Sequence, residues 1–227
     1  KSKEKLVILD SRPMREYEVM NIPGGINVPG AELSYRIDDL LVGPDTTIVV
    51  NCAGRTRSII GAQTLINAGI PNKVVALENG TMGWHLAGKE LEHGSSLRFP
   101  DISESGRKIA KLRAKNLFEK FNIKFVDFTA LSAMMADLNR TTYLLDVRDP
   151  SEYDLGHIPG SVSAPGGQLV QATDQYVGIR NSRLILIDDD DIRAVMTASW
   201  LKQMGWPEVF VFQGGVSCAG ELQLGPY

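Results

Sequence analysis

The chain alternates short apolar runs with a stretch of helical periodicity. Apolar residues recur at helical spacing over Ser58–Ala68, which predicts a helix that ends at Gly69 before Pro71. Three apolar, β-rich runs predict strands: Leu6–Leu9, Thr47–Val50 and Lys73–Leu77. The last strand leads into the turn signal Asn79-Gly80. The pattern therefore predicts the order strand, loop, strand, helix, strand.

The same order recurs 136 residues later along the chain. The matched motifs are Asp10-Ser11-Arg12 with Asp146-Val147-Arg148, Glu16-Tyr17 with Glu152-Tyr153, and Ile22-Pro23-Gly24 with Ile158-Pro159-Gly160. The elements predicted in the second copy are strands at Tyr143–Leu145, Leu184–Ile187 and Val209–Phe212, and a helix around Ala194–Met204. Near-continuous apolar strands that alternate with helices predict an α/β fold, with a mostly parallel central sheet flanked by helices in each copy.

We expect two tandem domains, at residues 1–95 and 123–227, and a linker at 96–122. Apolar residues at helical spacing among Lys, Arg, Glu and Ala predict a solvated, amphipathic linker helix over Ser103–Phe121. The second copy also has a strand and a helix predicted at Phe125–Leu138, before its first shared strand. Because the first copy has no counterpart, we expect that its N-terminal strand and helix are missing, either because the chain is cut from a longer one or because it begins with an incomplete domain.

Charge and cysteine content narrow the class of function. The 227 residues carry a net charge of −3 with both signs interspersed, which argues against nucleic-acid binding. Apolar runs are too short to span a membrane. Two cysteines, Cys52 and Cys218, and three scattered histidines, His85, His93 and His157, have no metal-ligand or disulfide-framework spacing. These counts predict a cytoplasmic protein without a metal and without membrane or nucleic-acid partners.

The candidate chemistry lies at Cys52, directly after a predicted strand. The segment Cys52–Ser58 lies between that strand and a helix, the position at which open α/β sheets bind ligands. Inward-pointing backbone N–H groups and the helix dipole favour an anion there and, together with two loop arginines, favour a thiolate on Cys52. Substrate contacts are predicted for Ala53, Gly54 at a tight curl, Arg55, Thr56, Arg57 and Ser58. The alternative is that Cys52 is a small buried hydrophobe.

Several motifs together resemble the rhodanese (sulfurtransferase) domain. They are the Asp-x-Arg opening, the Glu-Tyr pair, Gly-His-Ile-Pro-Gly at 156–160, the Cys-led loop at 52–57 and the Gly-Gly turn at 214–215. The resemblance implies two tandem rhodanese-like domains and a thiosulfate sulfurtransferase reaction without a cofactor. In that reaction Cys52 takes the sulfane sulfur as a persulfide and passes it to cyanide or another thiophilic acceptor. The implied partners are a small anionic sulfur donor and an acceptor, which can be a protein.

Loop length separates sulfur from phosphate chemistry within this resemblance. Cys52 to Arg57 spans six residues, as in sulfur-transferring rhodaneses, whereas related dual-specificity phosphatases use a loop one residue longer. Two loop arginines, Arg55 and Arg57, suit thiosulfate better than mercaptopyruvate and are expected to stabilise the departing sulfite. Sulfur transfer is therefore favoured over the alternatives of a phosphatase and an arsenate reductase.

In the second copy, the gap-free repeat places Asp188 where the first copy has Cys52. A carboxylate cannot form a persulfide, and the run Asp188–Asp191 would repel an anionic donor. We expect a non-catalytic second domain, in which this run is a solvated loop at a helix N-terminus rather than a metal site, and a structural Cys218. A further alternative is a protein-binding or regulatory module in which both domains are catalytically idle.

Overall fold

The computed structural model describes residues 5–41, 43–218 and 220–226. The chain divides into two compact units, Lys1–Ala110 and Lys111–Tyr227, which are described one after the other. Across the described residues, no helix combines the length and the apolar character needed to cross a membrane. The domain boundaries expected near residues 95 and 123 stay a prediction.

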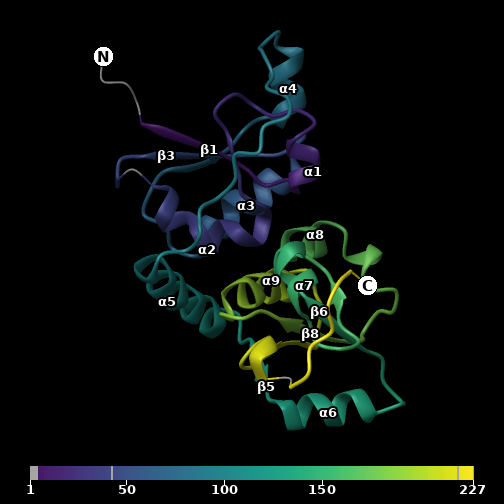
Figure 1. Cartoon of the computed structure of the whole chain (residues 1–227). Coiled ribbons are helices and arrows are strands. Elements are labelled where there is room, and N and C mark those ends of the chain that lie inside the picture. The colour runs from purple at the N-terminus through teal and green to yellow at the C-terminus, as the bar shows by residue number, and fades with distance from the viewer. Residues whose placement is uncertain (1–4, 42, 219, 227) are drawn as a thin grey trace. The chain divides into compact units, whose positions relative to one another are not determined.

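The first unit is built on a parallel sheet in the order β2-β1-β3-β4. Its strands are β1 (Leu6–Asp10), β2 (Ile26–Asn27), β3 (Thr47–Asn51) and β4 (Val74–Ala76). The register runs from Leu6 opposite Thr47 to Asp10 opposite Asn51. The parallel sheet and the three predicted strands are confirmed, and β1 and β3 are each one residue longer than predicted. Their carboxyl ends lie at the same edge of the sheet (Figure 1).

Helices connect these strands: α1 (Met14–Tyr17), α2 (Gly30–Leu40) and α3 (Thr56–Asn67); a further helix, α4 (Gly80–Leu86), follows β4. The helix predicted at 58–68 is confirmed as α3. The stretch that we interpreted as a loop between the first two strands contains α2, so that interpretation is wrong. The signal was present, because Leu33, Ile37 and Leu40 have helical spacing and are buried against the sheet.

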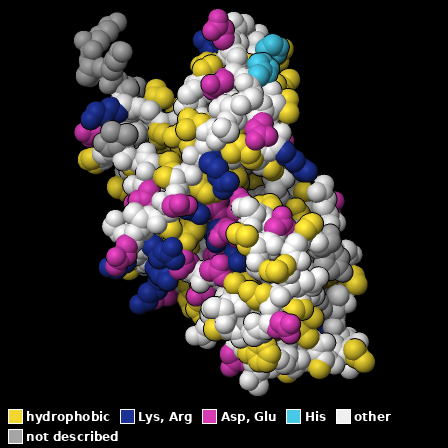
Figure 2. All heavy atoms as spheres, in the orientation of Figure 1, with side chains coloured by type: hydrophobic (Ala, Val, Ile, Leu, Met, Phe, Trp, Pro, Cys, Tyr) yellow, Lys and Arg dark blue, Asp and Glu magenta, His cyan; other side chains and the backbone are white. Residues whose placement is uncertain are grey.

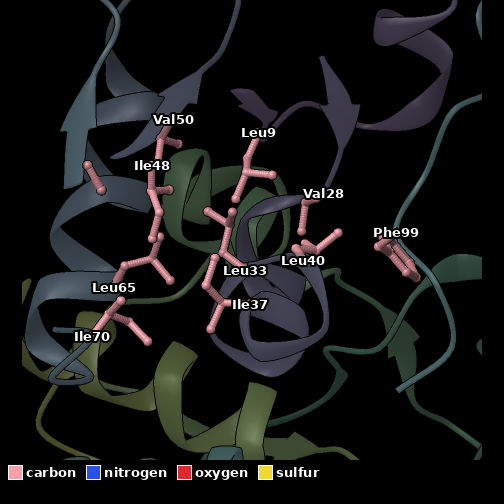
Figure 3. Close-up of a cluster of buried hydrophobic side chains, with 11 residues drawn as sticks. Leu9, Val28, Leu33, Ile37, Leu40, Ile48, Val50, Leu65, Ile70 and Phe99 are labelled. Carbon is pink, nitrogen blue, oxygen red and sulfur yellow. The ribbon is translucent and has the colours of Figure 1, made fainter. Parts of the chain in front are cut away.

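The core of the first unit joins the sheet to α2 and α3, which pack against each other. Figure 3 shows side chains from the strands and both helices meeting in one cluster. The labelled residues are Leu9, Val28, Leu33, Ile37, Leu40, Ile48, Val50, Leu65, Ile70 and Phe99. Val50 lies in β3, before the connection to α3, and Leu65 lies in α3, after it. Because both side chains belong to this cluster, the packing fixes the two ends of the connection.

The second unit has a parallel sheet in the order β5-β9-β8-β6-β7. Its strands are β5 (Lys124–Val126), β6 (Thr142–Asp146), β7 (Val162–Ser163), β8 (Arg183–Ile187) and β9 (Val209–Phe212). Its helices are α6 (Phe128–Ala136), α7 (Pro150–Leu155), α8 (Gly166–Gln171) and α9 (Ile192–Gln203), with 3-10 turns η1 (Thr173–Gln175) and η2 (Val216–Cys218). The strand and helix predicted at 125–138 are thus β5 and α6, and β5 has no counterpart in the four-stranded first sheet.

The two sheets share their register, which defines residue pairs beyond the sequence motifs. Ile48 lies opposite Val74 in the first sheet, and Leu184 lies opposite Val209 in the second. The repeat offset is therefore 136 at the third shared strand and 135 at the last one, so the second copy is one residue shorter between them. The offset of 135 pairs Gly80 with Gly215. It also pairs the residue that follows Gly80 with the residue that follows Gly215.

The helix predicted between the copies is α5 (Glu104–Lys120). It is less solvated than predicted, because Ala110, Ala114 and Leu117 are buried while Ile109 and Leu112 are exposed. Before α5, the chain packs on the first unit, where the Ser103 hydroxyl donates to the Asp39 carboxylate at 2.5 Å and Phe99 joins the core.

Candidate active site

Cys52 lies at the carboxyl end of β3, at the start of the loop that leads into α3. Its side chain is 2% exposed, and its Sγ lies 3.5 Å from the Ser58 hydroxyl oxygen. The Ser58 hydroxyl itself donates to the Arg55 carbonyl at 2.9 Å. The first-turn amides of α3 have no acceptor within the helix, so they are suited to bind an anion beside the sulfur.

The other predicted loop residues differ in exposure. Arg55 and Thr56 are exposed, Ala53, Gly54 and Arg57 are half-buried, and Ser58 is buried. The expectation that Gly54 supports a tight curl is wrong, because its φ is outside the left-handed region and an added Cβ would meet no atom within 4 Å. The loop thus turns without needing glycine at this position.

Arg57 forms a two-pronged ion pair with Glu16, which follows β1. Its two terminal nitrogens lie 2.7 Å from the two Glu16 carboxylate oxygens. The hydrogen bond from Arg57 lowers the pKa of Glu16 below its usual value. Burial opposes the charge of Arg57, but the Glu16 hydrogen bond and the nearby charges raise the Arg57 pKa overall. Contact between this guanidinium and a departing sulfite stays a prediction, since the structure shows it holding Glu16.

A short helix supports the loop from its other side. The Thr81 and Met82 amides of α4 donate to the carbonyls of Cys52 and Ala53, at 2.9 and 3.0 Å. Gly80 makes this approach possible: its φ is +57°, and a Cβ there would lie 2.3 Å from the Cys52 carbonyl oxygen. The sequence marked Gly80 as part of a turn but gave no sign that it packs against the cysteine loop.

In the second unit, the Asp188 carboxylate fills the place that corresponds to the Cys52 thiol. One carboxylate oxygen accepts the Arg193 and Ala194 amides at 2.8 and 3.4 Å, and the other accepts the Arg193 Nε at 2.9 Å. Asp188 is fully buried. The expected solvated loop is therefore wrong, because the carboxylate folds back onto the start of α9. This site shows that the loop and helix N-terminus of this fold can hold a negative group.

The remaining acidic residues of this loop also have close charged neighbours. Asp189 pairs with Arg148 at 3.0 Å, and Asp190 pairs with Lys111 at 3.0 Å. Burial and the charge of Asp188 raise the pKa of Asp191 to about 6. Among the residues that the structure describes, no three His, Cys, Asp or Glu side chains are grouped as a metal site would require.

Both units hold the end of their first shared strand with the same buried ion pair. Arg12 binds the Asp10 carboxylate at 2.7 Å and the Met20 carbonyl at 2.7 Å. Arg148 binds the Asp146 carboxylate and the Gly156 carbonyl at the same distances. In addition, Arg193 contacts Glu152 as Arg57 contacts Glu16. Both Glu16 and Arg57 recur at the same repeat offset in the sequence, but only the structure shows that they contact each other.

The residues outside these loops supply little further chemistry. His157 is buried and stacks on Tyr153 with ring centroids 3.7 Å apart, whereas Cys218, expected to be structural, is exposed. On the face drawn in Figure 2, basic and acidic side chains are interspersed. The Cys52 loop therefore remains the candidate site.

A family model described as the Rhodanese-like domain matches this chain twice, over residues 1–87 and 127–218. Among solved structures, a thiosulfate sulfurtransferase from Pseudomonas aeruginosa is 53% identical, with a TM-score of 0.93. The match covers 98% of this chain and 42% of that chain.

Among curated proteins, HTH-type transcriptional regulator Rv0324 from Mycobacterium tuberculosis is 32% identical over 97 residues, covering 43% of this chain and 42% of the relative. Putative sulfur carrier protein YrkF from Bacillus subtilis is 34% identical over 83 residues, covering 37% of this chain and 43% of the relative. The chain thus spans less than half the length of each of these relatives.

Proposed function

Because the chain belongs to the rhodanese-like family, we propose that its first domain is a sulfurtransferase that moves a sulfane sulfur from thiosulfate, or a similar donor, to cyanide or another thiophilic acceptor. The observation that carries the proposal is a cysteine at the head of a six-residue loop over the N-terminus of α3. The identity of 53% to a thiosulfate sulfurtransferase supports it.

The proposed reaction is a double displacement at Cys52. The thiolate attacks the outer sulfur of thiosulfate, and the donor's sulfur–sulfur bond breaks with its electron pair leaving on sulfite. The enzyme then carries the sulfur as a Cys52 persulfide anion. Cyanide attacks the terminal sulfur, takes it as thiocyanate and returns the thiolate, so no oxidant or reductant is consumed.

Loop groups have separate proposed roles in this reaction. The amides of Ala53 to Ser58 hold the persulfide anion, as the matching amides of Arg193 and Ala194 hold the Asp188 carboxylate. Arg55 is exposed and enters no ion pair within the described part of the chain, so its charge can attract the anionic donor and the departing sulfite. Arg57 adds positive charge but has its terminal nitrogens on Glu16.

We propose that the second domain is non-catalytic. Asp188 cannot carry a sulfane sulfur, and its carboxylate occupies the amides that an anion would need. This domain can instead bind a partner such as a protein sulfur acceptor. A reducing compartment such as the cytoplasm suits the free Cys52 thiol.

Mass spectrometry of the intact chain tests the proposal. Incubation with thiosulfate should add the mass of one sulfur atom, and later addition of cyanide should remove it with release of thiocyanate. Cys52→Ser should abolish the mass gain, while the matched variant Cys218→Ser should retain it. The proposal fails if no sulfane donor yields an adduct on Cys52, and faster turnover of an aryl phosphate than of thiosulfate would favour phosphatase chemistry.

A further inference from the structure

The peptide groups at the head of the cysteine loop are held by Thr81 and Met82 of α4. The Cys52 carbonyl accepts two hydrogen bonds from Thr81, from its amide at 2.9 Å and from its hydroxyl at 3.2 Å. The Ala53 carbonyl accepts the Met82 amide. In a trans peptide the N–H points opposite to the C=O, so these contacts turn the Ala53 and Gly54 amides away from α4. The hydrogen bonds from Thr81 and Met82 thereby set the direction of the Ala53 and Gly54 amides.

The hydroxyl of Thr81 is oriented in turn by a buried relay. Asn51 Nδ2 donates to the Thr81 hydroxyl oxygen at 2.9 Å and to an Asp10 carboxylate oxygen at 2.9 Å. Because the Thr81 oxygen accepts from Asn51, its hydrogen is directed to the Cys52 carbonyl. Asp10, Asn51 and Thr81 are each no more than 1% exposed. We call Asp10, Asn51 and Thr81 the polar relay.

The second domain keeps the strand pairing and the crowded glycine beside this relay but lacks its polar side chains. Ile187 replaces Asn51, since Asp146 pairs with Ile187 exactly as Asp10 pairs with Asn51. Val216 replaces Thr81, because it follows Gly215, whose added Cβ would lie 2.8 Å from the Asp188 carbonyl oxygen. The same fold is therefore built with apolar residues at these two positions.

The fold alone does not explain why polar side chains are buried at these two positions in the first domain. Burying an amide and a hydroxyl costs free energy that their hydrogen bonds only partly return, and the apolar pair in the second domain avoids this cost. The polar relay accompanies the loop that has a cysteine, and the apolar pair accompanies the loop that has an aspartate. The difference thus follows the chemistry of the loop.

We propose that Thr81, oriented by Asn51, is a positioning residue for sulfur transfer at Cys52. It holds the Cys52 peptide so that the loop amides face the reacting sulfur, and it does not touch the donor. The proposal rests on the sulfurtransferase function proposed above.

Single-turnover kinetics of Thr81→Val tests the relay. The variant keeps the shape and the backbone amide of Thr81 but removes the hydroxyl. We expect the rate of persulfide formation at saturating thiosulfate to fall about tenfold with KM changed less than about twofold, because the hydrogen bond acts on the sulfur's surroundings and not on the donor. Thr81→Ser should restore the rate.

Thr64→Val is the matched control. Thr64 is also buried, and its hydroxyl donates to the Ile60 carbonyl within α3, away from Cys52. This variant should lose similar stability and keep the wild-type rate. Equal rates for Thr81→Val and wild type, or equal losses in Thr81→Val and Thr64→Val, would overturn the proposal.

A double-mutant cycle tests the part played by Asn51. Asn51→Leu removes both relay hydrogen bonds at similar volume, and combining it with Thr81→Val should lower the rate little beyond the larger single effect. Additive losses would show that Asn51 does not act through Thr81.

A measurement without sulfur chemistry separates this proposal from the sulfurtransferase function. In the resting protein, the NMR resonances of the Ala53 and Gly54 amides should shift in Thr81→Val and stay in place in Thr64→Val. If the wild type transfers no sulfur but these resonances shift, the sulfurtransferase function fails while the anchoring of the loop stands. If they do not shift, the anchoring fails.

Discussion

The two loops that follow β3 and β8 connect matching strands and helices and have opposite contents. In the first, a thiol stands at the head of the loop, 3.5 Å from the Ser58 hydroxyl. In the second, the Asp188 carboxylate at the same position binds the Arg193 amide and guanidinium. The loop proposed to hold an external anion thus has a thiol at its head, whereas the other loop is filled by the carboxylate at its own head. The difference teaches that the start of the helix can hold a negative group, as it does for Asp188, whereas the proposed sulfur chemistry depends on the residue at the loop's head.

The arginine at the sixth position of each loop also has different partners in the two domains. Arg57 has Glu16 as its carboxylate partner, whereas Arg193 has both Glu152 and Asp188. The shared glutamate indicates a structural role for this arginine in both domains. The extra aspartate makes the second loop a closed ion-pair network.

The largest effect on this comparison should come from the two glycines that crowd the loops. Gly80→Ala and Gly215→Ala both place a Cβ at positive φ and within 3 Å of the loop backbone, so each should destabilise its own domain by about 2 kcal/mol. Displacement of the Cys52 loop should lower sulfur transfer about 100-fold in Gly80→Ala.

Thiocyanate formation from thiosulfate and cyanide, measured per folded molecule, provides the readout for both glycine variants. Gly215→Ala is the matched control and should retain the wild-type rate. A comparable loss in Gly215→Ala would mean that the second loop also takes part in the reaction.

An effect on stability alone, without a loss of sulfur transfer, is expected for Asp188→Asn. The amide keeps the shape but removes the charge that the buried Arg193 guanidinium contacts, so the second domain should lose about 3 kcal/mol. Faster amide hydrogen exchange in β8 and α9, with unchanged exchange in β3 and α3, would show the loss. Asp189→Asn should lose less than about 1 kcal/mol, because Asp189 is exposed and Arg148 keeps Asp146. Equal protection of the β8 and α9 amides from hydrogen exchange in Asp188→Asn and Asp189→Asn would contradict the interpretation of the second loop as a closed ion-pair network.

The smallest effect concerns Glu16 and pH. Arg57 lowers the folded-state pKa of Glu16, so the carboxylate stabilises the fold fully above its unfolded pKa and stops doing so as the pH falls through the lowered value. Glu16→Gln should therefore reduce the free energy of unfolding by less than about 1 kcal/mol at about pH 7, with a smaller reduction at about pH 3.

Urea unfolding at the two pH values measures the Glu16 effect. Glu104→Gln, which removes an exposed ion pair with Lys108, serves as the control and should show little change at either pH. A difference between wild type and Glu16→Gln that grows in acid would have the wrong sign for this ion pair.

The repeat made much of the fold predictable. A fixed offset between Asp10 and Asp146 aligned the strands, and the run after Thr47 identified the strand that leads into Cys52. Helix α2 was missed because its Pro-Gly start resembles a turn, although Leu33 and Ile37 have helical spacing. Periodicity thus predicted strands and helices best where no turn signal interrupted the pattern.

The side-chain contacts of the candidate site were harder to foresee. Four consecutive acidic residues from Asp188 predicted a solvated loop, because composition does not show that Arg193 folds back onto the first of them. The sequence likewise does not show that Arg57 contacts Glu16, since the two residues are distant in sequence. The relay from Asn51 to Thr81 joins residues 30 apart, and only the folded chain brings them together.

The buried Asp188 carboxylate also has a consequence for the number of anions that the chain can bind. Because it is covalently tethered beside the Arg193 amide, its effective concentration there far exceeds that of any dissolved sulfite or sulfate. A free anion would have to displace a charged group that cannot diffuse away. The second cradle is therefore saturated at every donor concentration, and titration with an oxyanion should give a stoichiometry of one per chain.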